Sequence, residues 1–396
     1  MNHKNRLSFK AVVFSIVIGL LIGCGGGWLL TKRIPKPSEA SASESTEPEE
    51  TPTPAPEVYD ASLFMTGDTV MHRPLVYEAR QADGSYDFSH LLGRVIPYAQ
   101  KYDLRYYNQE TILGGDERAI QGYPTFNTPQ AFGDYMVSNG FNLVSNATNH
   151  SLDQGVDGAL NSINYWKQQE AEGVHTAGMY ASAEEQAAVP VYEVNGITYS
   201  FFSWTYGMNG FQNPDDMPYL VNCFDGREDE MCNQIRAAKE KADVVIVAVH
   251  WGTEYQFSPD ETQTALAQRL ADAGADIIIG NHPHAIQPIQ WLNDHKTICF
   301  YALGNLCAAQ YFPSTIEMMA ALNIHKTVDQ GRTTIEIQNV KADLMYQYYK
   351  GEWYGFEVIP FADMTDDTYL DNHQAVYDEY KSIITELEPT IQIGGM

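Results

Sequence analysis

Six short polar clusters are the residues of this chain best suited to chemistry. Nearly all of them follow directly on an apolar run that is predicted to be a β-strand. In an open α/β sheet, ligands bind in the crevice beyond the carboxyl ends of the strands. Carboxylate, amide and imidazole groups gathered there would suit hard or borderline divalent metals, so the pattern predicts a metal-dependent site. In chain order the clusters are Gly67-Asp68, Asn108-Gln109-Glu110, Asn149-His150, His250-Trp251-Gly252, His282-Pro283-His284 and Gly304-Asn305.

Each cluster taken alone has a simpler explanation. A Gly67-Asp68 pair is usually structural, with the glycine letting the chain turn tightly. Glu110 alone would more often be a solvated surface residue, and His250 alone a satisfied core histidine. The recurrence of candidate ligands at so many strand ends, rather than any single residue, carries the prediction.

The pair His282 and His284 sets a condition on the backbone. Residues at i and i+2 of an extended strand point to opposite faces. Both histidines can therefore reach one pocket only if the strand has already turned into a loop, as Pro283 and Pro288 indicate. We expect the preceding strand to end before His282.

Length and charge limit the classes of partner. The chain has 396 residues, enough for one large domain or one domain with an appendage. It carries 24 basic and 51 acidic residues, for a net charge of -27. A nucleic acid partner is excluded, because no basic excess exists to displace phosphate counterions. An anionic polymer would have to be held locally, by metal or by a few side chains.

The N-terminus carries an apolar run of twenty residues, Ala11–Leu30, with basic residues before and after it. That length can cross a bilayer core of roughly 30 Å as a helix. Two hypotheses remain open. In one, the run is an uncleaved signal-anchor, residues 1–10 are cytoplasmic and the rest of the chain lies outside a single-pass membrane protein. In the other, the run is a lipoprotein signal, since Leu21-Ile22-Gly23-Cys24 resembles a lipobox with Cys24 as the lipidated residue.

A linker follows the apolar run. From Pro35 to Glu57 the chain is built from Pro, Ser, Thr, Ala, Glu and Lys, with no large apolar residue. Such a stretch cannot bury enough surface to offset its ordering entropy, so residues 31–57 are predicted to be a disordered tether of up to roughly 70 Å. The main domain is then expected at residues 58–362, followed by a C-terminal extension, 363–396, with one helix over Asp371–Leu387.

Strand and helix patterns alternate through the main domain. Val244–Val249 and Ile277–Ile279 are continuous apolar runs, as expected for strands that are covered on both faces. Alternation over roughly 260 residues predicts an α/β domain, and the later strands, which lack intervening helices, predict a sheet that becomes antiparallel. Helical spacing of apolar residues predicts helices over Ala131–Asn139, Asp157–Gln169, Asn233–Lys241 and Asp260–Ala273.

The cysteines do not form a metal-binding or redox motif. No CxxC pattern is present. Cys223 and Cys232 flank a short polar loop, and a disulfide between them or two unpaired thiols are both open.

The polar clusters, read with their neighbours, resemble the bacterial CapA family, the capsule-synthesis or PGA-cap domain linked to poly-γ-glutamate. The resemblance covers about residues 60–325 and extends towards 362. That family is similar to the calcineurin-like metallophosphoesterases, so the resemblance implies a metallophosphatase-like four-layer αββα sandwich of two mixed sheets. The matching segments are Met65–Asp68, Tyr107–Thr111, Ala147–Asp153, Val249–Tyr255, Gly280–His284 with Gln287, and Tyr301–Asn305.

The resemblance also implies roles for single residues. Asp68 and Glu110 would be carboxylate ligands, with Glu110 placed to bridge two metals, and His150 would be the proton donor or a hydrogen-bond donor to the transition state. The implied cofactor is one or two divalent ions, with Mn, Fe or Zn all compatible. The other implied ligands are Asn149, His250, His282 and His284, and the auxiliary candidates are His72, Glu254 and Asn305.

Two departures from the phosphoesterase pattern matter. Where those enzymes have a histidine two positions after the first aspartate, this chain has Val70, and His72 lies further on. The aspartate of the second motif is replaced by Glu110. The first metal position could therefore be incomplete, and the centre could hold one ion instead of two.

Three functional hypotheses follow. The first is a membrane-anchored CapA-like protein of capsule biosynthesis or export, with poly-γ-glutamate and capsule-synthesis membrane proteins as partners. The second is a metal-dependent hydrolase of a phosphoester or another envelope substrate, and the third is a non-catalytic envelope component. Aromatic residues near the clusters could floor a substrate groove, although core packing is the commoner role for any one of them. The four are Trp204, Tyr206, Trp251 and Tyr255, and the loop Gly207–Phe211 is expected near the mouth of the groove.

Overall fold

The computed structural model describes residues 55–396. The predicted cytoplasmic segment, the membrane span at residues 11–30, Cys24 and residues 31–54 of the linker lie outside the described residues. Within residues 55–396, no helix combines the length and the apolar character needed to span a membrane. The first strand begins at Glu57, the last residue of the expected linker.

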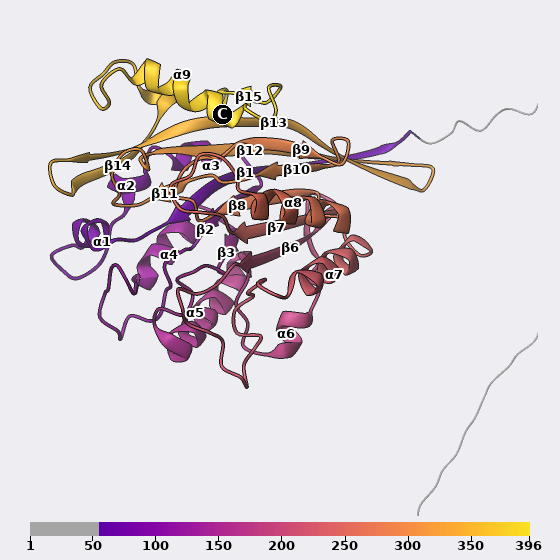
Figure 1. The fold of residues 1–396 in the computed structure, drawn as a ribbon, viewed down its shortest axis with the longest axis horizontal. Helices are drawn as coiled ribbons and strands as arrows, with labels where there is room; N and C mark the ends of the chain where they lie inside the picture. The colour runs from indigo at the N-terminus through magenta and orange to yellow at the C-terminus, as the bar shows by residue number, and fades with distance from the viewer. Residues whose placement is uncertain (1–54) are drawn as a thin grey trace, which may run out of the picture. The chain divides into compact units, whose positions relative to one another are not determined.

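The first of two mixed sheets contains the N-terminal strand and the C-terminal strands (Figure 1). Its order is β14-β13-β12-β1-β2-β3-β4, with β11 beside β1 and β15 beside β13. Strands β1 to β4 are parallel, whereas the pairs β1–β12, β12–β13 and β13–β14 are antiparallel. The bounds are β1 Glu57–Thr69, β2 Leu104–Asn108, β3 Leu143–Ser145, β4 His175–Ala177, β11 Asn305–Cys307, β12 Ile316–Asp329, β13 Arg332–Lys350, β14 Tyr354–Pro360 and β15 Gln392–Ile393.

The second sheet is built from the middle of the chain. Its order is β5-β6-β7-β8-β10-β9, with a parallel centre and one antiparallel strand at each edge. The fold is therefore a mixed α/β fold with two sheets. Strand–helix alternation alone would have predicted a single sheet. The bounds are β5 Tyr192–Val194, β6 Ile197–Thr205, β7 Val244–His250, β8 Ile277–Asn281, β9 Ile289–Leu292 and β10 Thr297–Phe300.

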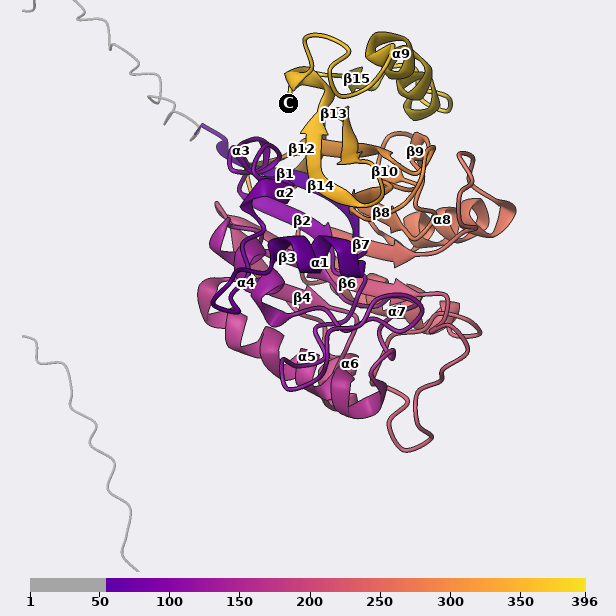
Figure 2. The same cartoon turned by 90° about the vertical axis from the view of Figure 1, so that its left-hand side faces the viewer.

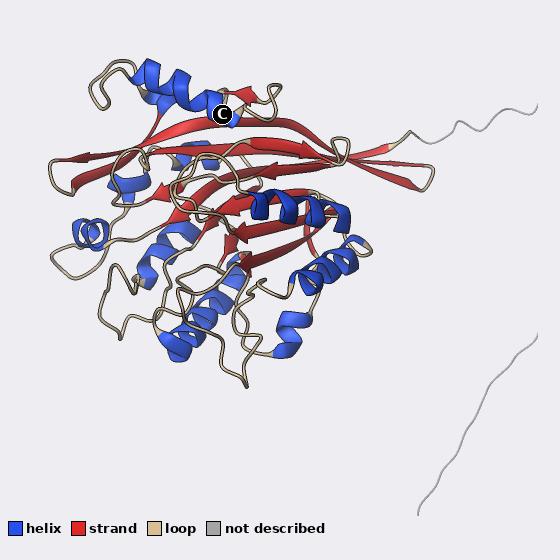
Figure 3. Cartoon of the chain, viewed as in Figure 1, coloured by secondary structure: helices blue, strands red, loops and turns tan. Residues whose placement is uncertain are grey.

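The main core lies between the two sheets, and helices cover the outer faces (Figure 3). Strand β7 shows why its sequence is apolar throughout. Val244, Ile246 and Ala248 pack into the core between the sheets, while Val245 and Val247 pack outwards against α7 and α8. The helices on the first sheet are α1 Arg73–Ala79, α2 Ser89–Leu92, α3 Ile96–Ala99, α4 Gln130–Ser138 and α5 Gly155–Gln169; those on the second are α7 Glu228–Lys239 and α8 Glu261–Ala273, while α6 spans Ala183–Ala187.

The C-terminal segment joins the inter-sheet core. Helix α9, His373–Ile384, is shorter than the predicted Asp371–Leu387 and lies beside β13 (Figure 2). Its Tyr380 and Ile384 are buried with residues of both sheets. Two short 3₁₀ helices, Glu170–Glu172 and Phe361–Asp363, complete the described elements.

The cysteine question is settled in favour of unpaired thiols. Cys223 and Cys232 are free, as are Cys299 and Cys307, the other two cysteines within residues 55–396. Burial raises the pKa of both the Cys223 and the Cys232 thiols.

Candidate metal centre

Strand register brings the predicted clusters to one edge of the fold. In the first sheet Asp68 pairs with Asn108, and Asn108 pairs with Ser145 on β3. In the second sheet His250 pairs with Asn281, the residue before His282. Because these neighbouring strands are parallel, their carboxyl ends lie together, as the α/β rule predicts.

Gly67 serves a purpose other than the predicted turn. Strand β1 does not turn there; it continues through Asp68 to Thr69. A Cβ atom at Gly67 would overlap the carbonyl oxygen of Gly304, and the Asp68 N–H donates to that oxygen at 2.9 Å. The tight-turn expectation was wrong. The glycine is required because two backbones approach closely.

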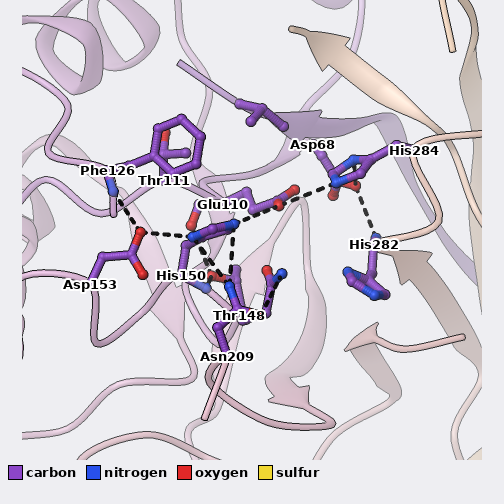
Figure 4. A network of polar contacts seen from close by, with 12 residues as sticks. Asp68, Glu110, Thr111, Phe126, Thr148, His150, Asp153, Asn209, His282 and His284 are labelled. Atoms are coloured by element: carbon purple, nitrogen blue, oxygen red, sulfur yellow. Dashed lines mark hydrogen bonds and ion pairs between the residues drawn. The ribbon is translucent and has the colours of Figure 1, made fainter. Parts of the chain in front are cut away.

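Two groups of ligand atoms form the centre. Asp68, Glu110 and His250 offer ligand atoms that all lie within 4.8 Å of one another, and Glu254, His282 and His284 do the same. The groups adjoin, since His284 Nε2 lies 3.6 Å from Glu110 Oε1. Figure 4 shows Glu110 between His150 on one side and Asp68 and His284 on the other.

Glu110 has the environment of a metal ligand. Its side chain is buried, and neither carboxylate oxygen has a hydrogen-bond partner. Burial raises the pKa of Glu110 well above its usual value, although the positive charge of His284 opposes that rise. A buried carboxylate that accepts no hydrogen bond is costly even beside a charged His284, so a cation at this position would relieve the cost. The residues present therefore fit a divalent metal.

Two of the histidines are held ready as neutral ligands. Burial lowers the pKa of His250 well below its usual value and that of His282 to about 3, and neighbouring histidines add to both effects. Metal ligands must be unprotonated imidazoles. His282 Nδ1 has no hydrogen-bond partner among the described residues, which leaves it available for coordination.

Two asparagines order the ligands around Asp68 and His250. Asn149 Oδ1 lies 3.0 Å from His250 Nε2. The Asn149 amide, which was predicted to be a ligand, therefore lies beside the His250 ring. Asn108 Nδ2 donates to Asp68 Oδ1 at 2.8 Å and lies 3.4 Å from His250 Nδ1. Asn108 was part of a predicted cluster, but its orienting role becomes visible only in three dimensions.

The backbone after β8 meets the condition set by the His282–His284 spacing. Strand β8 ends at Asn281, and both histidines have positive φ, 97° and 52°. This irregular segment turns both side chains towards one pocket. The His282 N–H also donates to Asp68 Oδ2 at 2.9 Å, which ties the segment to β1.

A buried network orients His284. Asn305 Oδ1 lies 2.9 Å from His284 Nδ1, and Asn305 Nδ2 donates to Glu317 at 2.9 Å. Burial raises the pKa of Glu317 to about 8, although hydrogen bonds from Asn305 and Gln347 act to lower it. Sequence reasoning missed Glu317. The available signal was a charged residue inside the apolar run of β12, Ile316-Glu317-Met318-Met319.

His150 is held by a carboxylate three residues further on. Its Nδ1 lies 2.7 Å from Asp153 Oδ2, and Asp153 also accepts the Phe126 N–H at 2.6 Å. The other ring nitrogen, Nε2, lies 4.0 Å from Glu110 Oε1. Asp153 was noted downstream of His150 in the sequence but was given no role.

The remaining candidates have mixed positions. Glu254 joins His282 and His284, and Asn305 supports His284. His72 belongs to neither ligand group found within residues 55–396; its Nδ1 lies 3.2 Å from the Ala309 nitrogen. Burial lowers the pKa of His72 to about 4, so its ring is neutral.

The four aromatic residues considered for a groove floor divide into two buried and two exposed residues. Trp204 and Trp251 pack in the core of the second sheet, which confirms the core-packing alternative for both. Tyr206 and Tyr255 are exposed, and their rings lie beside His282 and His284.

The family model for the bacterial capsule synthesis protein PGA_cap matches residues 62–310. This range covers more than half of the chain and contains all six clusters. The chain belongs to the PGA_cap family. Residues from β12 onward, including Glu317 and α9, lie beyond the part that the PGA_cap model matches.

Two curated relatives carry names that agree with PGA_cap membership. The chain is 32% identical over 176 residues to the PGA biosynthesis protein CapA of Bacillus subtilis, which is 44% of each chain. It is 27% identical over 285 residues to the capsule biosynthesis protein CapA of Bacillus anthracis, covering 70% of this chain and 66% of the relative. The matches thus span less than two thirds of either relative.

A solved structure of a phosphatase from Mycoplasma pneumoniae is also similar to this chain. The match has a TM-score of 0.40 and 14% sequence identity, and covers 72% of this chain and 95% of that one. At these values the likeness does not bear on the activity of this PGA_cap protein.

Proposed function

We propose that this protein takes part in the synthesis or export of a capsule polymer such as poly-γ-glutamate, and that it works through a divalent metal centre. Family membership and the names of the two CapA relatives support the capsule role. We further propose that residues 11–30 anchor the chain in the membrane, or that Cys24 does so through a lipid, with the described domain outside the cytoplasm. The apolar run and its flanking basic residues support this placement.

The metal centre is the part of the proposal that the geometry supports best. The single observation behind it is Glu110, a buried carboxylate with both oxygens unpartnered among histidines and Asp68. The site has room for one or two ions in this proposal, because Glu110 belongs to the first ligand group and adjoins His284 of the second. We assign as ligands Asp68, Glu110, Asn149, His250, His282 and His284, with Glu254 as an additional candidate.

The proposed activity is metal-dependent hydrolysis of a phosphoester or related bond of an envelope substrate. When bound, a divalent ion supplies Lewis-acid polarisation of the electrophile and of the attacking water. Asp153 would fix the His150 tautomer with a proton on Nδ1 and stabilise the imidazolium, so that Nε2 can deliver a proton to the leaving group. A metallophosphatase-like αββα fold is consistent with two facing mixed sheets, outer helices and ligands at the carboxyl ends of strands.

A direct test measures metal binding and turnover in the same preparation. Full-length protein would be titrated with Mn²⁺ and assayed on a chromogenic phosphodiester, beside the variants Glu110→Ala and His150→Ala. We expect wild type and His150→Ala to bind the ion, Glu110→Ala to bind it at least tenfold more weakly, and only wild type to turn over substrate. If wild type binds no divalent ion, the metal centre is refuted.

In one alternative the protein binds the metal but catalyses no reaction. The ion would then coordinate carboxylates of the polymer, and the protein would be an accessory for export or tethering. Val70, where the phosphoesterase pattern has histidine, and the position of His72 outside both ligand groups favour this alternative. The His150–Asp153 pair favours hydrolysis, because metal gripping does not require it. Metal binding without turnover on any phosphoester would support the accessory role.

A non-catalytic structural role is the third candidate. A strain that carries Glu110→Ala separates it from the other two, because a structural component does not need the metal ligand. Loss of surface polymer with normal protein level would exclude the structural role.

A further inference from the structure

A groove opens beside the metal centre, on the side of Tyr206. It has a volume of about 730 Å³ and is lined largely by the segment between β6 and α7, including Phe211 and Tyr219. Tyr206 belongs to the groove and to the centre. Its ring centroid lies 4.7 Å from that of His282 and 6.5 Å from that of His250. A chain-like ligand in the groove would therefore reach the metal ligands directly.

Exposed aromatic side chains lie on the loops that follow strands bearing the candidate ligands. Eight aromatic residues within residues 55–396 are exposed, and six of these lie on the loops that follow β2, β6, β7 and β11. The ring of one of them, Tyr255, lies 6.1 Å from that of His284. Apolar groups exposed together on one face mark a binding site more often than scattered ones do. The six are Tyr123, Tyr206, Phe211, Tyr255, Tyr311 and Phe312.

The charge of these loops limits what they can bind. Residues 111–129, 206–226, 252–260 and 308–315 contain one arginine, no lysine and seven carboxylates. The cation that lines the groove itself, Arg227, is neutralised by Glu230 through two bonds of 2.6 and 2.9 Å. A polyanion would meet like charges here. The seven carboxylates are Asp116, Glu117, Asp215, Asp216, Asp225, Glu254 and Asp260.

A tight turn connects the groove to the centre. Asn209 and Gly210 both have positive φ, 49° and 85°, and the Phe211 N–H donates to the Met208 carbonyl at 2.8 Å. This Asn-Gly turn places Asn209 at the centre, where its Nδ2 lies 3.5 Å from both ring nitrogens of His150 (Figure 4). The same turn presents the Phe211 ring to the groove.

A groove lined by aromatic rings and side-chain amides, with no unpaired basic side chain, has the chemistry of a sugar-binding site. The two faces of a pyranose carry C–H groups that pack on an aromatic ring, while its hydroxyls exchange hydrogen bonds with planar amides. The side chain of Gln212 in the groove is exposed and has no protein hydrogen bond among the described residues, whereas the Asn209 amide already contacts Asn149 and His150.

We propose that this groove binds a sugar chain that lacks acidic groups, with rings stacked on Tyr206 and Phe211 and the chain continuing into the metal centre. The inference rests on the proposed function, because it treats the groove as a subsite of that centre. It concerns the hydrolase part of that proposal alone, and it names the envelope substrate of that part as a glycan.

The test is direct binding to the full-length protein, with and without Mn²⁺. The probes are short uncharged oligomers of N-acetylglucosamine, glucose and galactose. Poly-γ-glutamate of matched length is tested in the same way as the acidic comparison polymer. We expect at least one uncharged oligomer to bind even without metal, and Phe211→Ala and Tyr206→Ala each to weaken it about three- to tenfold. Tyr354→Ala, which removes an equally exposed ring on β14, should leave binding unchanged.

Two results would overturn the inference. One is that no uncharged oligomer binds. The other is that poly-γ-glutamate binds, that Arg73→Ala weakens its binding, and that Phe211→Ala does not. Arg73 is an exposed cation near Gly122. Failure of the proposed function looks different: oligomers would bind at the groove, yet no metal would bind and no substrate would turn over.

Discussion

Asn305 Oδ1 lies 2.9 Å from His284 Nδ1, and this contact decides which nitrogen of His284 faces the ligand groups. Because Asn305 Nδ2 donates to Glu317, its oxygen must face the imidazole and accept a proton from Nδ1. Nε2 is then left towards Glu110, 3.6 Å away. Partners that fix a ligand's tautomer and orientation in this way affect metal affinity nearly as strongly as the ligands do.

Asn305→Ala should therefore weaken metal binding without removing a ligand. We expect the Mn²⁺ affinity to fall about 10- to 100-fold, measured by calorimetry. Gln310→Ala is the matched control, since Gln310 Oε1 accepts from the same Asn305 amide at 3.1 Å but does not touch His284. Equal affinities for wild type and Asn305→Ala would show that His284 needs no such support.

Asp153→Asn should slow turnover while leaving the metal in place. The carboxylate that stabilises a protonated His150 is lost, so proton delivery to the leaving group becomes harder. We expect kcat to fall about 10²- to 10⁴-fold with unchanged Mn²⁺ affinity. Asp157→Asn, an exposed change in the first turn of α5, is the control. Wild-type kcat in Asp153→Asn would remove His150 from the proposed proton transfer.

Gly304→Ala should destabilise the fold near the centre. Gly304 has φ of 71°, and an added Cβ would overlap Glu317 Oε2. We expect the free energy of unfolding to fall by about 2 kcal/mol or more, measured by denaturant titration. Gly207→Ala provides the comparison, because no atom lies within 4 Å of the Cβ it adds. If both variants unfold at the same denaturant concentration, the packing of Glu317 against Gly304 is not tight.

Asp243 forms hydrogen bonds to one residue of each sheet. The free energy of unfolding should therefore depend on pH through this carboxyl group. It accepts hydrogen bonds from Lys326 on β12 at 2.7 Å and from Thr198 on β6 at 2.9 Å. Burial acts to raise the pKa of Asp243, but these hydrogen bonds outweigh burial and hold the pKa below the usual value of an aspartate. A carboxyl with a depressed folded pKa stabilises the protein above its unfolded pKa, and that stability is lost as pH falls through the folded value.

Asp243→Asn should consequently cost roughly 1 kcal/mol of unfolding free energy at neutral pH. The difference from wild type should shrink as pH falls through the depressed pKa of Asp243, where the wild-type carboxyl also becomes neutral. Urea titrations of both proteins at several pH values measure this. A difference that stays constant down to the lowest pH would contradict the assignment.

The sequence by itself predicted the α/β class and the buried strands, and the family resemblance implied the candidate ligands. Val244–Val249 is apolar at every position, which is the pattern of a strand covered on both faces, and β7 confirms it. Helix α8 begins after the capping residue Asp260 and ends before Gly274, as local propensity requires. These features could be predicted because short-range chemistry along the chain specifies them.

Only the tertiary structure decided how those ligands are held. Gly67 is a glycine because Gly304, far away in the chain, approaches it, and Glu317 matters because it is buried behind Asn305. Helices α1 to α3 were missed, since their apolar residues make sense only against the sheet that they cover. Burial and the meeting of distant backbones are properties of packing, and no local pattern of residues encodes them.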